Sequence, residues 1–81
     1  MEHRNWRWVS RDNDHSDMVD IWIGEEPPEI LDDDNGDIIF DGRPLFSPNH
    51  DEFLSLTGID IQPGQCVKVE FTAKVLEDGT P

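Results

Sequence analysis

Cysteine, basic residues and long apolar runs are all scarce in this chain of 81 residues. The single cysteine, Cys66, excludes a disulfide within the chain and is typical of a protein in a reducing compartment. No apolar stretch approaches the roughly 20 residues that a membrane-spanning helix needs, and the first five residues lack the apolar run of a signal peptide. We therefore expect a soluble cytoplasmic protein without a membrane partner.

The shortage of basic residues leaves a net charge of −13, from 6 Lys and Arg against 19 Asp and Glu. The excess is concentrated in residues 12–60, which hold fifteen carboxylates and one base, Arg43. Such a surface repels nucleic acid and membranes and attracts basic protein surfaces. Direct binding of DNA or RNA is not expected, because it needs basic groups that neutralise phosphates.

Metal-binding and catalytic motifs are also missing. A calcium-loop alignment places Asp33, Asn35 and Gly36 at the third, fifth and sixth positions, but it puts Leu31 and Gly42 at ligand positions that neither can fill. His3, His15, His50 and Cys66 have no zinc-ligand spacing. No nucleophile elbow or phosphate-binding glycine loop is present. We expect a protein that is not an enzyme and has no metal or cofactor.

The alternation of apolar and polar residues between Trp6 and Ile23 predicts a β-hairpin around an acidic loop, residues 12–17. A register with Arg11 opposite Met18 gives the hairpin two faces. The expected core face holds Trp6, Trp8, Ser10, Val19, Ile21 and Ile23, and the other holds Arg7, Val9, Arg11, Met18, Asp20 and Trp22. The second face would place Arg7 opposite Trp22 for cation–π stacking and offer a contact surface.

The rest of the chain predicts two more strands and a helix. A Gly-Glu-Glu-Pro-Pro connector and a turn at residues 32–36 lead to a strand at 37–40. A short helix begins near His50, capped by Ser47 or Asn49, and ends at Gly58. A turn at residues 62–65 precedes an alternating strand from Val67 to Val75.

The expected fold is therefore α+β, a small antiparallel sheet with the element order β-β-β-α-β and one short helix packed on one face. Residues 1–81 form a single domain, and residues 76–81 are expected to fray. The helix stripe of Phe53 and Leu54 and the strand residues Val67, Val69 and Phe71 are expected to join the hairpin core.

Several short motifs resemble uncharacterised small proteins encoded by bacteriophages and prophages. They are Trp8-Val9-Ser10-Arg11-Asp12, Ile21-Trp22-Ile23-Gly24 followed by Pro27-Pro28, and the terminal Val67-Lys68-Val69-Glu70-Phe71. The resemblance implies no activity, because that group has none assigned. It implies a phage origin, for which inhibition of a host nuclease, CRISPR or restriction complex is a natural role. The Asp32–Asp34 run and the longer helix at 47–58 depart from that pattern.

Charge and resemblance together predict a DNA-mimic-like protein that binds a basic groove on a host nucleic-acid-processing or defence enzyme. The expected binding residues are Asp12, Asp14, Asp17, Glu25, Glu26, Glu29, Asp32, Asp33, Asp34, Asp37, Arg7 and Trp22. A simpler interpretation is that the acidic face only keeps a small domain soluble. The alternative function is an assembly module that forms a homo-oligomer through its hairpin or a sheet edge.

Overall fold

The computed structural model describes residues 5–14, 17–32, 36–72 and 75–80, which form two antiparallel sheets and one helix. The predicted α+β class is therefore confirmed, with one more strand than expected. The elements are β1 (Trp6–Ser10), β2 (Asp20–Ile21), β3 (Glu29–Asp32), β4 (Ile38–Asp41), α1 (His50–Thr57) and β5 (Cys66–Glu70). No helix in these ranges is long and apolar enough to cross a bilayer.

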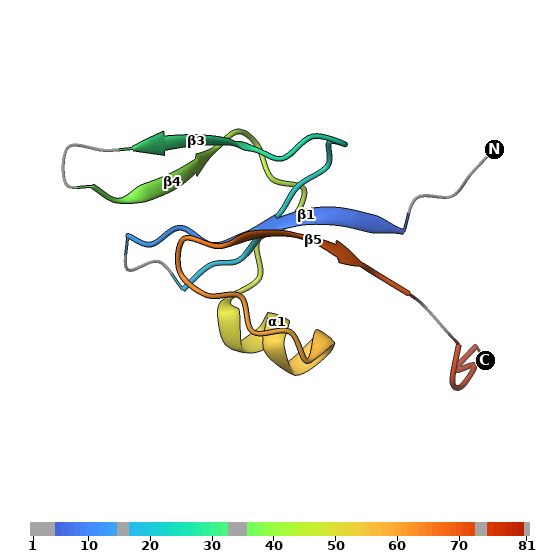
Figure 1. The fold of residues 1–81 in the computed structure, drawn as a ribbon. Coiled ribbons are helices and arrows are strands. Elements are labelled where there is room, and N and C mark those ends of the chain that lie inside the picture. Colours follow the sequence, from blue (N-terminus) through green and yellow to red (C-terminus); the bar gives the residue numbers. More distant parts are fainter. Residues whose placement is uncertain (1–4, 15–16, 33–35, 73–74, 81) are drawn as a thin grey trace.

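The main sheet has the strand order β2-β1-β5, and β3 and β4 form a separate two-stranded ribbon. Figure 1 shows the sheet as the middle layer, with α1 on one side of it and the ribbon on the other. The first and last strands of the chain are therefore neighbours, and Arg7 lies opposite Val69 in their register. The segment at residues 45–49 covers the outer edge of β2, where Ile21 N–H donates to the Phe46 carbonyl and Val19 N–H to the Pro48 carbonyl.

The core lies between the sheet and the helix. It is built on Val9, Val19, Phe53, Ile61 and Val69, with Ile21, Ile59, Val67 and Phe71 packed around it. The prediction was right for Val19, Ile21, Phe53, Val67, Val69 and Phe71. It was wrong for the first strand of the hairpin, because β1 turns Val9 toward the helix and Trp6 and Trp8 away from this core, and it was wrong for Ile23, which is 67% exposed.

A shift of one residue in the hairpin register explains that error. Val9 pairs with Ile21 and Ser10 with Asp20, whereas the predicted register paired Ser10 with Val19. A shift of one residue exchanges the two faces of a strand relative to its partner. The regular strand β2 is also shorter than the predicted residues 18–23.

Helix α1 forms as its local sequence predicts. Of the two proposed caps, Asn49 is the one used, since its Oδ1 accepts from Glu52 N–H at 2.7 Å. Gly58 ends the helix with φ 75°, and its N–H donates to the Leu54 carbonyl. Phe53 is the buried residue of the helix and contacts Phe71 edge to face, with 6.4 Å between the ring centres.

Strand β3 is the element that the sequence analysis missed. Glu29–Asp32 pairs with Ile38–Asp41, so that the expected connector and the strand at 37–40 together form a hairpin. The signal was the turn at residues 32–36 between two apolar runs, a spacing typical of hairpins. Strand β5 ends at Glu70, earlier than the predicted Val75. Residues 75–80 form no helix or strand.

Candidate protein-binding surface

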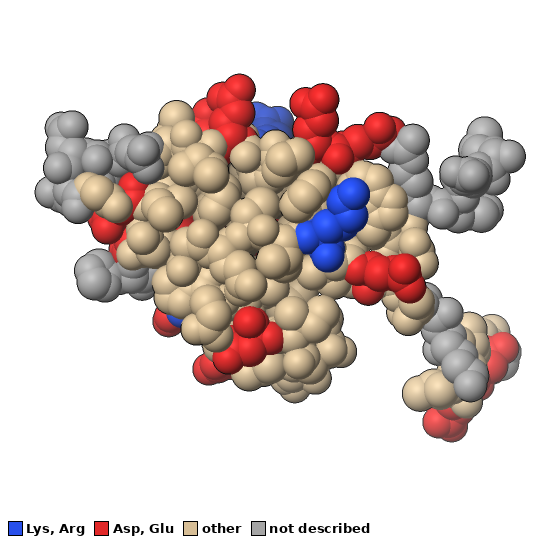
Figure 2. Space-filling view, viewed as in Figure 1, with Lys and Arg blue, Asp and Glu red and all other residues tan. Residues whose placement is uncertain are grey.

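The β3–β4 ribbon is the part of the fold where acidic residues meet exposed apolar ones. Figure 2 shows acidic side chains, with basic atoms among them, along the margin formed by β3, β4 and the segment that leads into β3. The centre of the same view consists mostly of uncharged residues. The charge excess is therefore concentrated at the margin of this view.

One face of the ribbon, which we call the ribbon face, consists of Glu29, Leu31, Ile39 and Asp41. In the β3–β4 register Leu31 lies opposite Ile39 and Glu29 opposite Asp41. Leu31 is 48% exposed, and both carboxylates are exposed. Phe40, which points to the other face, is buried. The ribbon face thus has an apolar centre beside an acidic end.

The pairing of Glu29 with Asp41 is electrostatically unfavourable, because like charges directly opposite each other on two strands repel. A cation in either place would have stabilised the ribbon instead. Glu25 and Glu26 are also exposed and lie on the segment just before β3. This end of the ribbon therefore presents several exposed carboxylates that a basic surface would attract.

Side chains of the main sheet and its loop hold the ribbon in place. Asp12 Oδ1 accepts from Phe40 N–H at 2.9 Å, and Asn13 Oδ1 accepts from Ile38 N–H at 2.6 Å. The Asn13 N–H donates to the Ile38 carbonyl, so the loop after β1 continues along the outer edge of β4. Trp8 Nε1–H donates to the Glu25 carbonyl and fixes the segment that leads into β3.

Asp12 was predicted to contact a partner, and in the structure its carboxylate accepts the hydrogen bond from Phe40 N–H. It is half-buried, and burial raises the pKa of its carboxyl group, an effect that the hydrogen bond from Phe40 N–H opposes. Asp17 lies 3.9 Å from the Arg11 guanidinium and is otherwise open to solvent. Asp14 and Asp37 are half-buried.

Three further predicted residues, Asp32, Asp33 and Asp34, are consecutive in the chain. Asp32 is the last residue of β3 and pairs with Ile38. Asp33 and Asp34 lie outside the described residues. Of the predicted set, Glu29 lies opposite Asp41, which was not among the predicted binding residues, and Glu25 and Glu26 are exposed on the segment just before β3.

The predicted contact between Arg7 and Trp22 is not formed. Trp22 is 6% exposed, and its Nε1–H donates to Ser10 Oγ at 2.8 Å inside the molecule. Arg7 lies on the core side of the sheet beside a shallow apolar groove of about 310 Å³, which Ile21, Phe46 and Phe71 also line. The basic–aromatic contact is made by Lys68 instead, whose Nζ lies 4.3 Å from the Trp6 ring centre and 5.2 Å from that of Trp8.

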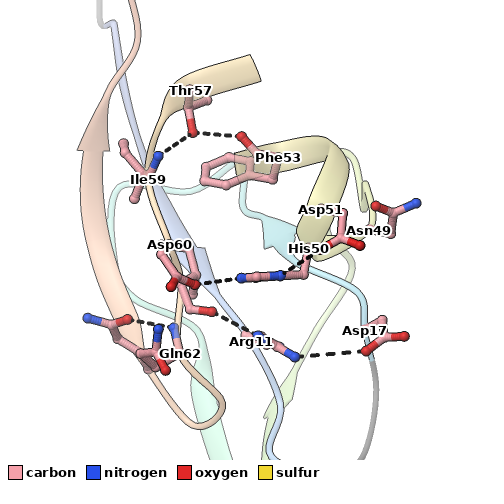
Figure 3. A network of polar contacts seen from close by, with 12 residues as sticks. Arg11, Asp17, Asn49, His50, Asp51, Phe53, Thr57, Ile59, Asp60 and Gln62 are labelled. Atoms are coloured by element: carbon pink, nitrogen blue, oxygen red, sulfur yellow. Dashed lines mark hydrogen bonds and ion pairs between the residues drawn. The ribbon is translucent and has the colours of Figure 1, made fainter. Parts of the chain in front are cut away.

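Figure 3 shows a second polar cluster, between the start of α1 and the segment before β5. His50 Nε2 lies 2.6 Å from Asp60 Oδ1, and its Nδ1 lies 3.3 Å from Asp51 Oδ1. The hydrogen bond to Asp60 raises the pKa of His50 and lowers the pKa of Asp60. The nearby Arg11 donates to the Ile61 carbonyl at 3.1 Å. These contacts hold the chain after the helix against the loop after β1.

Within the described residues, no three His, Cys, Asp or Glu side chains are placed to hold a metal ion. Burial raises the pKa of the Cys66 thiol, which disfavours the reactive thiolate.

Comparison of the chain with protein-family models, curated proteins and solved structures gave no match.

Proposed function

We propose that this protein binds, without catalysis, a basic groove on a host nucleic-acid-processing or defence enzyme and blocks that groove with its β3–β4 ribbon. The exposed carboxylates Glu25, Glu26, Glu29 and Asp41 would replace the phosphates of the usual ligand. Leu31 and Ile39 would supply the apolar centre that a protein interface needs inside its polar rim. The resemblance to phage-encoded proteins is the reason for choosing a host enzyme as the target.

The observation that carries the proposal is the like-charge pair of Glu29 and Asp41 on an exposed, partly apolar ribbon face. An acidic face that served only solubility would gain by pairing one of these carboxylates with a cation across the strands. The repulsion lowers the stability of the ribbon, and a basic partner surface removes it. The repulsion between Glu29 and Asp41 therefore lowers the stability of the ribbon but favours the binding of a basic surface.

The test is a Glu29→Lys variant, which places a cation opposite Asp41. We expect a gain in the free energy of unfolding of roughly 0.2–1 kcal/mol, because an opposite-charge pair replaces a repulsive one. We expect at the same time less protein captured from a nuclease-treated bacterial lysate, with binding by the original chain falling steeply as salt is added. Glu77→Lys makes the same charge change in the C-terminal segment and is the matched control.

Equal capture by the original chain and both variants would refute the proposal. If Glu29→Lys and Glu77→Lys reduced the amount of captured protein equally, the partner would be recognising net charge and not the ribbon. A loss confined to the more stable Glu29→Lys variant cannot be attributed to unfolding.

A further inference from the structure

Among the described residues, the outer edge of β5 has no neighbouring strand, whereas other segments bond to the outer edges of β2 and β4. The loop after β1 bonds to β4, and the segment at residues 45–49 bonds to β2. Strand β5 ends the sheet order β2-β1-β5, and no described strand pairs with its other side. Edges of this kind invite pairing with another chain.

The hydrogen-bond pattern shows which backbone groups this edge presents. Phe71 N–H donates to the Asn5 carbonyl, and Arg11 N–H donates to the Gln65 carbonyl. In an antiparallel ladder the inward-bonding residues alternate with outward-facing ones. The N–H and C=O groups of Cys66, Lys68 and Glu70 therefore point away from β1.

We infer that two copies of the chain associate by antiparallel pairing of their β5 edges, in the two-fold register that places Lys68 opposite Glu70 of the second copy. Both residues belong to the outward-bonding set, so this register forms ladder hydrogen bonds. The two-fold symmetry repeats the pair, which gives two opposite-charge contacts. The registers shifted by one bonding step place Lys68 opposite Lys68 or Glu70 opposite Glu70, and both pairs are repulsive.

The side chains at this edge are arranged for such a contact. Lys68 and Glu70 lie on the same face of β5, and both are exposed. Contact with the rings of Trp6 and Trp8 keeps the Lys68 ammonium on this face. Because both rings belong to β1, pairing with Glu70 of the second copy requires the Lys68 side chain to turn toward the outer edge of β5.

The core side of β5 is apolar along the same edge. The register places Val69 opposite Val69 of the second copy and Val67 opposite Phe71, so the apolar strip continues from one sheet into the other. A groove of about 200 Å³ lies there, lined in part by Leu56, Val69 and Phe71. Leu56 is 75% exposed and stands beside this strip.

Charge favours a second copy at β5 over the open side of β3. Residues 61–81 carry a net charge of only −1, whereas pairing of two β3 strands would bring together the acidic ribbons. Pairing at β5 uses residues outside the ribbon face. The inference therefore stands independently of the proposed function.

The experiment measures self-association by sedimentation equilibrium of the full chain over a wide concentration range. We expect a monomer–dimer equilibrium, and at least about tenfold weaker association for either Lys68→Glu or Glu70→Lys, since each replaces two attractive pairs by repulsive ones. Glu77→Lys, with the same charge change as Glu70→Lys, should associate as the original chain does. Circular dichroism confirms that each variant is folded.

Mixing the two variants gives the decisive result. In a heterodimer of Lys68→Glu with Glu70→Lys, every pair in the proposed register is again of opposite charge, so the 1:1 mixture should recover the association that each variant lacks. The inference is overturned by a monomeric original chain, by dimerisation that the reversals do not change, or by variants that stay monomeric when mixed. The first outcome would mean that Lys68 protects the edge against pairing.

Discussion

The hydrogen bond between Trp22 and Ser10 explains why Trp22 is buried and does not lie on a contact surface. The indole N–H of Trp22 is buried and donates to Ser10 Oγ, itself 0% exposed. The bond lets a large amphipathic side chain lie inside the molecule with its polar atom satisfied. A residue that was expected on a contact surface is therefore part of the structural interior.

We predict that Ser10→Ala lowers the free energy of unfolding by about 1–3 kcal/mol, because it leaves the buried Trp22 N–H without its acceptor. Urea denaturation measures the change. Ser55→Ala removes an exposed hydroxyl from α1 and should stay within about 0.5 kcal/mol of the original chain. Equal effects of the two substitutions would contradict the role given to the Trp22–Ser10 bond.

The contact between His50 and Asp60 makes the stability of the fold depend on pH. The hydrogen bond between them raises the pKa of His50 above its ordinary value of 6.5 and lowers that of Asp60 below 3.8. The folded state thus holds the His50 proton more tightly than the unfolded state does. The stabilisation is fully present from roughly pH 4 to pH 6.5 and is lost as the pH rises through the folded pKa of His50.

We predict that the urea midpoint falls as the pH is raised above about 6.5, and that this fall is smaller in His50→Gln and in Asp60→Asn. Asp51→Asn, which changes the longer of the two contacts to His50, should keep most of the fall. Comparing the fall in the urea midpoint of each variant with that of the original chain distinguishes the contribution of the His50–Asp60 pair from that of general repulsion among carboxylates. An identical fall in all four proteins would show that the pair contributes nothing.

At the scale of elements, the ribbon depends on two side chains from the loop after β1. Asp12 and Asn13 accept hydrogen bonds from N–H groups on the outer edge of β4. The two side chains therefore satisfy N–H groups of β4 that would otherwise bond to another strand. This arrangement couples the position of the acidic ribbon to the main sheet.

We predict that Asp12→Ala exposes the Phe40 amide to faster hydrogen exchange, equivalent to a local loss of about 1–3 kcal/mol. Asp12→Asn keeps an oxygen acceptor and removes a charge whose burial is unfavourable, so exchange at Phe40 should stay close to that of the original chain. Faster exchange in the asparagine variant as well would mean that the charge, and not the acceptor, holds the ribbon.

The elements also show what the sequence can predict. Asn49 and Gly58 bound α1 through contacts within a few residues, and local sequence suffices for them. Gln65 N–H donates to the Gln62 carbonyl and Gly64 has φ 80°, as the predicted turn requires. The buried face of the hairpin could not be assigned in this way, because both of its faces carry apolar residues. The pairing of β1 with β5, which lies far along the chain, also helps to determine which face is buried. The partners of the carboxylates could not be predicted either, because residues such as Asp12, Asp20 and Asp60 bond to groups that are distant in the sequence.

Over the whole molecule, the net charge of −13 is divided between two uses. Asp12, Asp20 and Asp60 accept hydrogen bonds that hold segments of the fold together. Glu25, Glu26, Glu29 and Asp41 are exposed on the ribbon and on the segment that leads into it, and Glu29 lies opposite Asp41. The proposed function belongs to this second group. Two ribbons in a β5-paired dimer would allow bivalent attachment.

The most direct measurement of the proposed groove-blocking role is competition with duplex DNA. A protein captured by the chain from a nuclease-treated bacterial lysate is bound to it again at fixed salt, and duplex DNA is titrated into the complex. We predict that DNA displaces the chain completely and that the chain inhibits the activity of the captured enzyme. A stable complex of chain, enzyme and DNA, with that activity unchanged, would contradict the account.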